Sequence, residues 1–243
     1  MGRKSDTGIS KDALQLNFCT AGDYGEHAVR LFKTIHNLYP KAKLHYNSID
    51  CDKDQLNRMR RLGVSVVEIA TSQVPKCLSG LDKAALCRAW RSVMLPAVLG
   101  STGEPVVWFD SDSVLLKPLD DIIQKISKHD MALVSRPGRP PHKSLMSGVA
   151  FFNLYEDVGK FFHKWMTATS VAYADNRLRF FADQLALYQT VNAFLPNWLA
   201  LDPKVYCSHW DNDPVIASWP SNMHDNLIWI DLINKSDSCL TAI

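Results

Sequence analysis

The strongest structural signal in the chain is Val106-Val107-Trp108-Phe109-Asp110-Ser111-Asp112, in which four apolar residues precede two acids separated by one residue. The β-branched and aromatic run predicts a short buried strand. Because open α/β sheets bind ligands at the carboxyl ends of their strands, Asp110 and Asp112 are expected at the mouth of a crevice. Two clustered carboxylates there can hold Mg²⁺ or Mn²⁺ and, through the cation, a diphosphate. The alternative is an acidic turn whose side chains cap a helix beginning near Pro118.

Predicted strands and helices alternate along most of the chain. Strands are expected over residues 14–19, 43–47, 64–69, 106–109, 131–134 and 147–153. Helices are expected over residues 24–39, 55–62, 83–99, 118–128, 159–173 and 182–191. This alternation predicts an α/β fold whose mostly parallel sheet is covered by helices on both faces. Since no repeat or convincing linker interrupts it, residues 14–243 are expected to form one domain after a flexible leader over residues 1–13.

The composition is that of an ordinary globular protein, with 47% hydrophobic and 21% charged residues among 243. The net charge is +2, from 27 basic and 25 acidic side chains, and gives no reason to expect nucleic-acid binding or attraction to a membrane surface. No apolar run approaches the ~20 residues of a membrane span, and the N-terminus lacks the apolar segment of a signal peptide. The six cysteines include no Cys-x-x-Cys pair, which argues against zinc and redox motifs and indicates reduced thiols. A cytoplasmic location is expected.

Four short motifs occur in an order that resembles a known enzyme family. They are Lys83-Ala84-Ala85-Leu86-Cys87-Arg88, Val107-Trp108-Phe109-Asp110-Ser111-Asp112, Ser147-Gly148-Val149-Ala150-Phe151-Phe152-Asn153 and Asp183-Gln184. Over residues 14–210 the chain resembles nucleotide-sugar glycosyltransferases of the GT-A fold, and it is similar to the glycogenin-like and galactosyltransferase-like members of glycosyltransferase family 8. The resemblance implies a Rossmann-type mixed sheet, a UDP-sugar donor, Mn²⁺ or Mg²⁺, and transfer with retention of anomeric configuration. The acceptor would be a glycan, a lipid or a protein.

The metal site that the resemblance implies consists of Asp110, Asp112 and His209. Asp110 would contact the ribose or the water shell of the metal, Asp112 would ligate the cation, and the imidazole of His209 suits Mn²⁺ better than Mg²⁺. Such a cation neutralises the diphosphate as it leaves. On the acceptor side, Asp183 with Gln184 is expected to orient the acceptor hydroxyl or to act as a general base. The other interpretation of Asp183 is a structural one, as an acid in the first turn of a helix.

The residues expected to bind the donor come from four places in the chain. Residues at the end of the first strand would bind the nucleoside, and residues in the helix before the metal motif would add positive charge. Residues of the metal motif would contact the nucleotide, and residues near position 147 would border the sugar. They are Thr20, Ala21, Asp23, Tyr24, Lys83, Arg88, Asp110, Ser111, Ser147 and Gly148. A solvated helix face would also explain Lys83 and Arg88. Arg91, three residues further along the same face, is a substitute for Arg88.

The chain departs from the family pattern at two positions. The family's Lys-Pro-Trp segment after the histidine is replaced by Pro214-Val215-Ile216-Ala217-Ser218-Trp219, so its phosphate-binding lysine is missing. Lys143 and Arg139, in a Pro-rich loop over residues 136–141, are candidates to replace it. Met146 stands where the family has an asparagine before the Ser-Gly pair.

Two other functions fit parts of the sequence. The apolar strand with Asp-x-Asp also fits the start of a haloacid-dehalogenase-like phosphatase, with Asp110 as nucleophile, Asp112 as acid and Ser135 as the later hydroxyl. Chains of that class usually carry this strand near their N-terminus, and no convincing acidic pair follows a later strand here. The remaining alternative is a non-catalytic GT-A module that only binds an acceptor or a partner.

Overall fold

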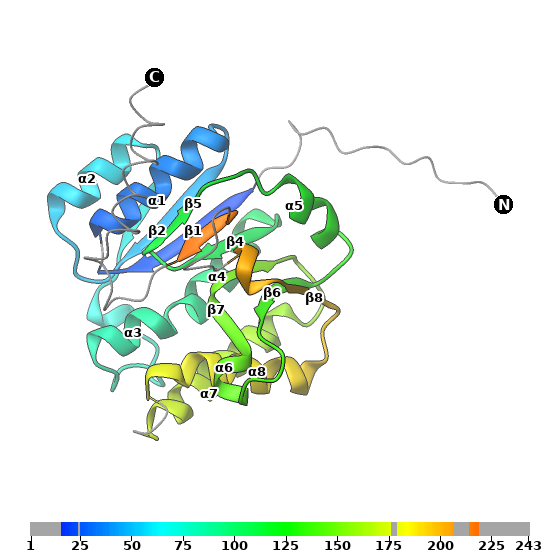
Figure 1. Cartoon of the computed structure of the whole chain (residues 1–243). Helices are drawn as coiled ribbons and strands as arrows, with labels where there is room; N and C mark the ends of the chain where they lie inside the picture. The colour runs from blue at the N-terminus through cyan, green and yellow to red at the C-terminus, as the bar shows by residue number, and fades with distance from the viewer. Residues whose placement is uncertain (1–15, 24, 176–178, 207–213, 219–243) are drawn as a thin grey trace.

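The centre of the molecule is a seven-stranded sheet with the strand order β3-β2-β1-β4-β7-β6-β8 (Figure 1). The computed structural model describes residues 16–23, 25–175, 179–206 and 214–218, to which all structural statements refer. The strands of the sheet are β1 (Asn17–Gly22), β2 (Lys43–Ser48), β3 (Ser65–Glu68), β4 (Val106–Phe109), β6 (Met131–Ser135), β7 (Leu145–Phe152) and β8 (Trp198–Leu201). Neighbouring strands are parallel except β7, which runs antiparallel to both β4 and β6. The mixed, mostly parallel sheet predicted from the sequence is confirmed.

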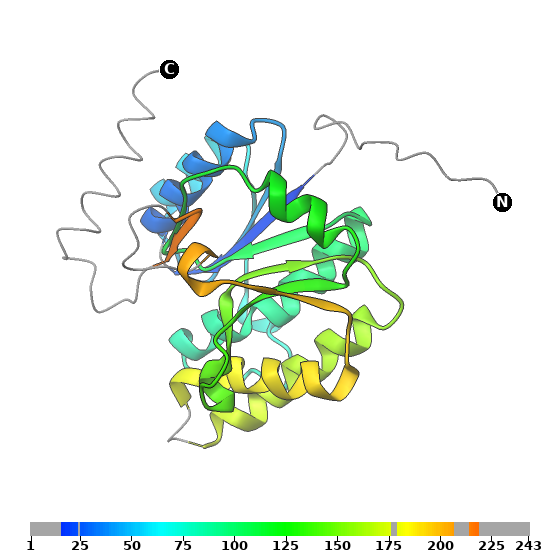
Figure 2. The same cartoon turned by 45° about the vertical axis from the view of Figure 1, so that its right-hand side comes forward.

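Helices cover both faces of this sheet (Figure 2). One face packs against α1 (Gly25–Leu38), α2 (Lys53–Arg61) and α5 (Asp120–Ile126). The other packs against α4 (Arg91–Thr102), α7 (Val158–Tyr173) and α8 (Ala182–Phe194), with α3 (Lys83–Ala89) beside α4 and α7. Shorter elements are α6 (Pro141–Ser144), α9 (Pro203–Tyr206), the 3₁₀ helices η1 (Thr71–Gln73) and η2 (Arg179–Phe181), and a two-stranded ribbon of β5 (Ser113–Leu115) and β9 (Ile216–Ser218).

β4 lies inside the sheet and is buried on both sides. Val107 and Phe109 pack into the layer of α1 and α5, whereas Val106 and Trp108 pack into the layer of α4 and α7. Strands covered on both faces need an unbroken apolar run rather than an alternating one, which is why this segment is apolar at every position. Asp110, the first residue beyond β4, is therefore fixed at the carboxyl edge of a rigid strand.

The direction of β7 brings two distant segments together. Phe109 pairs with Val149 and Trp108 with Ala150. Because β7 is antiparallel to β4, its N-terminal end lies where β1 and β4 end. The backbone N–H of Asp110 donates to the carbonyl of Gly148 at 2.7 Å, so the Ser-Gly pair is adjacent to the first acid.

The segment after the acids forms a second, smaller sheet. Val114 of β5 pairs with Ala217 of β9, and the N–H of Leu116 donates to the Val215 carbonyl at 2.9 Å. Residues that stand in place of the family's Lys-Pro-Trp segment are thus tied to the chain that follows Asp112.

Two elements in the first half differ most from the sequence predictions. The strand expected to end at Cys19 continues to Gly22, because its ladder with β2 extends to the pair Gly22 and Ser48. The helix expected over residues 83–99 is divided at Trp90 into α3 and α4. The second part ends after Thr102, where Gly103 adopts the left-handed conformation with φ 67° that glycine allows.

Asp110 and Asp112 belong to a turn in which the Ser113 N–H donates to the Asp110 carbonyl at 2.9 Å, but their side chains do not cap α5 as the acidic-turn alternative predicts. The N-cap of α5 is Leu119, which makes no side-chain capping bond, and the acids of its first turn are its own Asp120 and Asp121.

Two composition-based expectations concern the thiols and the membrane. Cys19, Cys51, Cys77 and Cys87 have free thiols, while Cys207 and Cys239 lie outside the described residues. Among the described helices, none has both the length and the apolar character needed to cross a membrane.

Candidate active site

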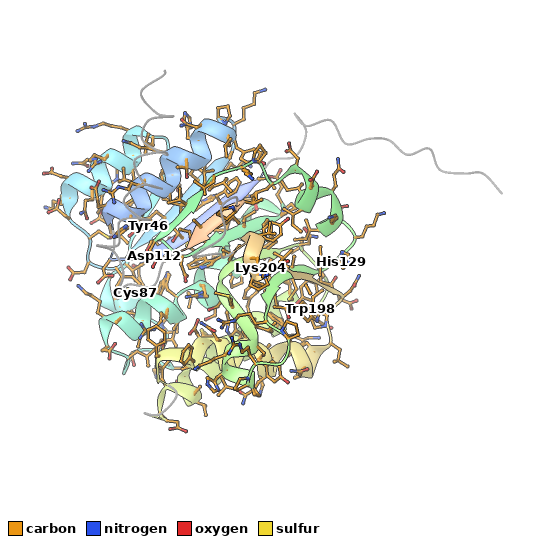
Figure 3. All side chains as sticks on the ribbon, in the orientation of Figure 1. Tyr46, Cys87, Asp112, His129, Trp198 and Lys204 are labelled. Atoms are coloured by element: carbon orange, nitrogen blue, oxygen red, sulfur yellow. The ribbon has the colours of Figure 1, made fainter. Side chains whose placement is uncertain are left out.

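The ends of β1 and β4, the start of β7 and the start of α8 meet at one edge of the sheet. Ser111, directly after Asp110, approaches β1: its hydroxyl oxygen lies 3.8 Å from where a Cβ on Gly22 would be. The Gly22 carbonyl accepts a hydrogen bond from the Tyr46 hydroxyl at 2.8 Å. Figure 3 shows Tyr46 and Asp112 at this edge. Both acids therefore stand where open α/β sheets bind ligands.

Arg91, the first residue of α4, connects three parts of this edge. Its side chain is only 4% exposed, and its Nη2 lies 3.1 Å from Asp110 Oδ1 and 3.5 Å from Asp183 Oδ2. Nη1 donates to the carbonyl of Ser147. The planar guanidinium, with five N–H donors, can serve all three groups at once. Arg91 therefore holds Asp110, the start of β7 and the start of α8 in one cluster, which we call the Arg91 cluster.

Two further contacts fix the orientation of Arg91. Its Nε donates to the Arg88 carbonyl at 2.8 Å, and its guanidinium carbon lies 5.4 Å from the centre of the Trp108 ring. Trp108 Nε1 also donates to Asp110 Oδ1 at 3.3 Å. One oxygen of Asp110 is thus held by protein donors, yet its side chain remains 38% exposed and open to a ligand.

Asp183 lies in the first turn of α8 with its side chain almost completely buried. Its Oδ2 accepts a hydrogen bond from Ser147 Oγ at 2.6 Å and pairs with Arg91. Asp183 Oδ1 and Gln184 Oε1 are buried and have no hydrogen-bond partner within the part of the chain that the structure describes. Because a buried acceptor without a donor is costly, these two oxygens are suited to a ligand hydroxyl or to water. The first-turn position agrees with the structural interpretation of Asp183, and its role toward an acceptor stays a prediction.

The carboxyl group of Asp112 has a strongly raised pKa. Burial and, second to it, the charge of Asp110 raise the pKa of Asp112 to about 8. A divalent cation would relieve this penalty because its charge compensates both carboxylates, and hard carboxylate oxygens fit Mn²⁺ or Mg²⁺. Within the described ranges, no three His, Cys, Asp or Glu side chains gather into a metal site. The third predicted ligand, His209, lies outside those ranges.

The end of β1 carries the residues predicted to grip the nucleoside. Thr20 is fully buried, and its hydroxyl has no partner among the residues that the structure describes. Ala21 packs into the core on the α4 face of the sheet. Asp23 Oδ2 pairs with Lys83 Nζ at 3.3 Å. Tyr24, the fourth of these predictions, lies outside the described residues.

Lys83 and Arg88 lie on the same helix, but their contacts lead to different places. Lys83 is shared between Asp23 and Asp50, and hydrogen bonds to these two acids raise the pKa of Lys83. Arg88 Nε donates to the Tyr173 hydroxyl at 3.2 Å, on α7. The contact with Asp110 is made by Arg91, which the sequence offered only as a substitute for Arg88.

The phosphatase alternative finds no support in the sheet. Ser135, its candidate hydroxyl, ends β6, and β7 separates β6 from β4. Neighbouring strands are spaced by about 4.8 Å, so two spacings separate the strand of Ser135 from that of Asp110. Asp110 is instead surrounded by Arg91, Trp108 and Gly148.

Comparisons with known proteins agree on the fold. No protein-family model matches the sequence, and no curated protein does. Among solved structures, the galactosyltransferase LgtC in complex with donor and acceptor sugar analogues is similar with a TM-score of 0.55 and 9% identity, over 93% of this chain and 96% of that chain. An active-site mutant of LgtC gives a TM-score of 0.57 over the same shares, also at 9% identity.

Two further glycosyltransferases are also similar in structure. Mouse xyloside xylosyltransferase 1 in its apo form has a TM-score of 0.51 and 10% identity, over 86% of this chain and 98% of that chain. The glycosyltransferase GlyE of Streptococcus pneumoniae TIGR4 has a TM-score of 0.55 and 13% identity, over 93% of this chain and 64% of that chain. The strand order, the position of the acids and these similarities together show that the chain has a GT-A-like glycosyltransferase fold.

Proposed function

We propose that this protein is a metal-dependent glycosyltransferase that transfers a sugar from a nucleotide-diphosphate donor, with UDP as the expected nucleotide, to a glycan, lipid or protein acceptor. The Arg91 cluster is the main support for this proposal. It joins the first acid of the Asp-x-Asp motif to the Ser-Gly pair and to Asp183, which the sequence resemblance assigns to the metal, the sugar pocket and the acceptor side. The complex of LgtC with donor and acceptor sugar analogues supports the same kind of reaction.

Asp110 and Asp112 would hold Mn²⁺ or Mg²⁺, with His209 as the third ligand. When bound, the cation supplies positive charge to the departing diphosphate. Thr20, Ala21, Asp23 and Tyr24 would contact the nucleoside at the end of β1. Asp23 supports this assignment best, because its side chain is 22% exposed at this end of β1, whereas the hydroxyl of Thr20 is buried.

Retention of configuration is proposed from the surroundings of Asp183. A general base must be free to take a proton, whereas Asp183 Oδ2 is held by Ser147 and Arg91. Its free oxygen, with that of Gln184, is suited to orienting a sugar hydroxyl. The proton of the acceptor hydroxyl would then pass to an oxygen of the leaving diphosphate.

Binding of a nucleotide diphosphate together with a metal tests this proposal. We expect UDP with Mn²⁺ to raise the melting temperature by roughly 5 to 10 °C at about 100 times the dissociation constant, and either component alone to do much less. The measurement is a thermal-shift panel of UDP, GDP and ADP, each with and without Mn²⁺. The Asp112→Ala variant should lose the shift, whereas Asp54→Asn, on the exposed side of α2, should keep it.

Three results would contradict the proposal. One is the absence of a shift with every nucleotide; another is an equal shift without metal. The third is turnover of a generic phosphate ester that Asp110→Asn abolishes, which would support the phosphatase instead. Binding of UDP with Mn²⁺ but no transfer to any acceptor would indicate the non-catalytic module.

Gly148→Ala is expected to damage the site without unfolding the protein. A Cβ at this position would lie 2.7 Å from Asp110 Oδ2, so the carboxylate must move. A displacement of this size is expected to weaken the affinity for UDP with Mn²⁺ by about 10- to 100-fold. Titration calorimetry measures the affinity. Gly159→Ala on α7, where a Cβ has open space, is the matched control, and equal affinity in both variants would contradict the prediction.

A further inference from the structure

The hairpin loop between β6 and β7, residues 136–144, lies at the same edge of the sheet as the Arg91 cluster. Its ends are fixed, because Ser135 pairs with Leu145 and the N–H of Arg136 donates to the Ser144 carbonyl at 2.8 Å. Pro137, Pro140 and Pro141 restrict the backbone between these ends. The loop contains α6, which packs against α8 (Figures 1 and 2). It is therefore a constrained structure rather than a loose connection.

This loop carries positive charge without acids. Residues 131–155 contain no Asp or Glu, and Arg136, Arg139, His142 and Lys143 fall within eight consecutive positions. Basic and acidic residues nearly balance in the chain as a whole, at 27 and 25. Arg139 is exposed, and among the described residues neither Arg139 nor Lys143 is paired with an acid. Cations left without acidic partners at a ligand-binding edge are available for an anionic ligand.

Aromatic rings connect this charge to the candidate active site. Lys143 Nζ lies 5.0 Å from the centre of the Phe181 ring, and the ring of His142 lies 5.5 Å from it. Phe181 is two residues before Asp183 at the start of α8. On the other side, Phe180 is 59% exposed, and the guanidinium carbon of Arg88 lies 5.2 Å from its ring centre. We call these residues, together with the exposed Arg139 of the same loop, the basic-aromatic strip: Arg88, Arg139, His142, Lys143, Phe180 and Phe181.

We infer that the basic-aromatic strip binds an anionic group, a phosphate or a carboxylate, on the sugar-containing acceptor. Arginine and lysine recognise both anions through charge-assisted hydrogen bonds, and the exposed face of Phe180 offers an apolar surface to a sugar ring. The inference rests on the proposed function, because it gives the acceptor of that reaction its chemical class.

The position of the strip distinguishes this role from binding of the donor diphosphate. The nucleoside end of the site is at β1, on one side of β4, whereas the loop joins β7 and β6, on the other side. The Ser147 hydroxyl, three residues after α6, donates to Asp183 on the acceptor side. An anion on the strip would therefore lie next to Asp183 rather than next to the base.

Titration calorimetry with three matched sugars tests the inference. The probes are methyl glucoside, glucose 6-phosphate and glucuronate, added to the protein with UDP and Mn²⁺ present. We expect at least one anionic probe to bind at least tenfold more tightly than methyl glucoside. Its binding should weaken as the salt concentration rises. The phosphate and carboxylate arms identify which anion is preferred.

Variants of the loop separate this site from the donor site. Arg139→Gln/Lys143→Gln should remove the advantage of the anionic probe and leave the affinity for UDP with Mn²⁺ within about twofold. The control Lys53→Gln/Arg61→Gln removes the same charge from exposed positions of α2. It should change neither the preference for the anionic probe nor the affinity for UDP with Mn²⁺.

Each remaining outcome overturns the inference. Equal binding of the three sugars does so even when UDP binds with Mn²⁺, and the proposed function then stands alone. Loss of UDP binding in the loop variant would assign Arg139 and Lys143 to the donor diphosphate. If UDP does not bind with any metal, the proposed function fails, and the inference fails with it because it assigns the acceptor of that reaction.

Discussion

Asp112→Asn is expected to lower the rate of sugar transfer by about 10³-fold or more, because the variant loses a charged ligand for the proposed cation, which would compensate the leaving diphosphate. The change is nearly isosteric, so the loss should not come from altered packing. The rate is measured as release of UDP from the donor at saturating Mn²⁺. Asp54→Asn on α2 is the control, and wild-type turnover by Asp112→Asn would contradict the metal site.

The same variant has a second expected effect, which needs no substrate. An aspartate in the unfolded chain loses its proton at a pH of about 4, whereas burial and Asp110 raise the pKa of Asp112 in the folded protein to about 8. Between these values the folded state binds more protons than the unfolded state, so its stability falls as the pH rises. Without metal, the wild type should therefore lose stability between pH 5 and pH 8 by more than Asp112→Asn does.

Thermal unfolding in the presence of a chelator measures this difference. At pH 8 the melting temperature of Asp112→Asn should exceed that of the wild type, and at pH 5 the two should be closer. Added Mn²⁺ should raise the melting temperature of the wild type but not that of Asp112→Asn. Parallel pH profiles of the two proteins would show that Asp112 does not carry a raised pKa.

Arg91→Met is expected to lower the free energy of unfolding by about 3 to 5 kcal/mol, because it leaves the buried charge of Asp183 without its partner. For a chain of this size the melting temperature would fall by roughly 6 to 20 °C. Denaturant unfolding measures the loss. Nucleotide binding should weaken as well, since Asp110 and the start of β7 lose their common anchor.

A double variant separates the charge effect from lost packing. Arg91→Met/Asp183→Asn should recover part of the stability, because the asparagine removes the unpaired charge. Arg61→Met, at an exposed position of α2, should stay within about 0.5 kcal/mol of the wild type. If Arg91→Met is as stable as Arg61→Met, the Arg91 cluster does not hold the edge together.

The fold could be predicted where the local sequence marks the ends of a strand or helix. β4 matches its predicted range of residues 106–109, because an unbroken apolar run ends there at two acids. The direction of β7 was not predicted, because a strand buried on both faces has the same apolar sequence in either orientation. The predicted strands leave twelve residues between them, enough for a parallel crossover, whereas the observed connection between β6 and β7 has nine, which is too short for one.

The site was predicted where short motifs mark it and missed where tertiary contacts decide. Asp110, Ser147, Gly148 and Asp183 were named from the sequence, and the structure brings them together. The importance of Arg91 could not be separated from that of Arg88, because the spacing alone places both on one helix face. An arginine followed closely by Met94 and Leu95 lies on a buried face and therefore needs acidic partners, which is the signal that could have singled it out.

The strand ladder separates the basic loop between β6 and β7 from the residues of the candidate active site. Ser135 and Leu145, which flank the loop, are paired in the strand ladder, and the Ser147-Gly148 pair follows after Leu145. Residues 136–144 can therefore vary in length and charge while the reacting groups keep their places. If the proposed function holds, exchange of this one surface loop would redirect sugar transfer to a new recipient molecule without rebuilding the reacting groups.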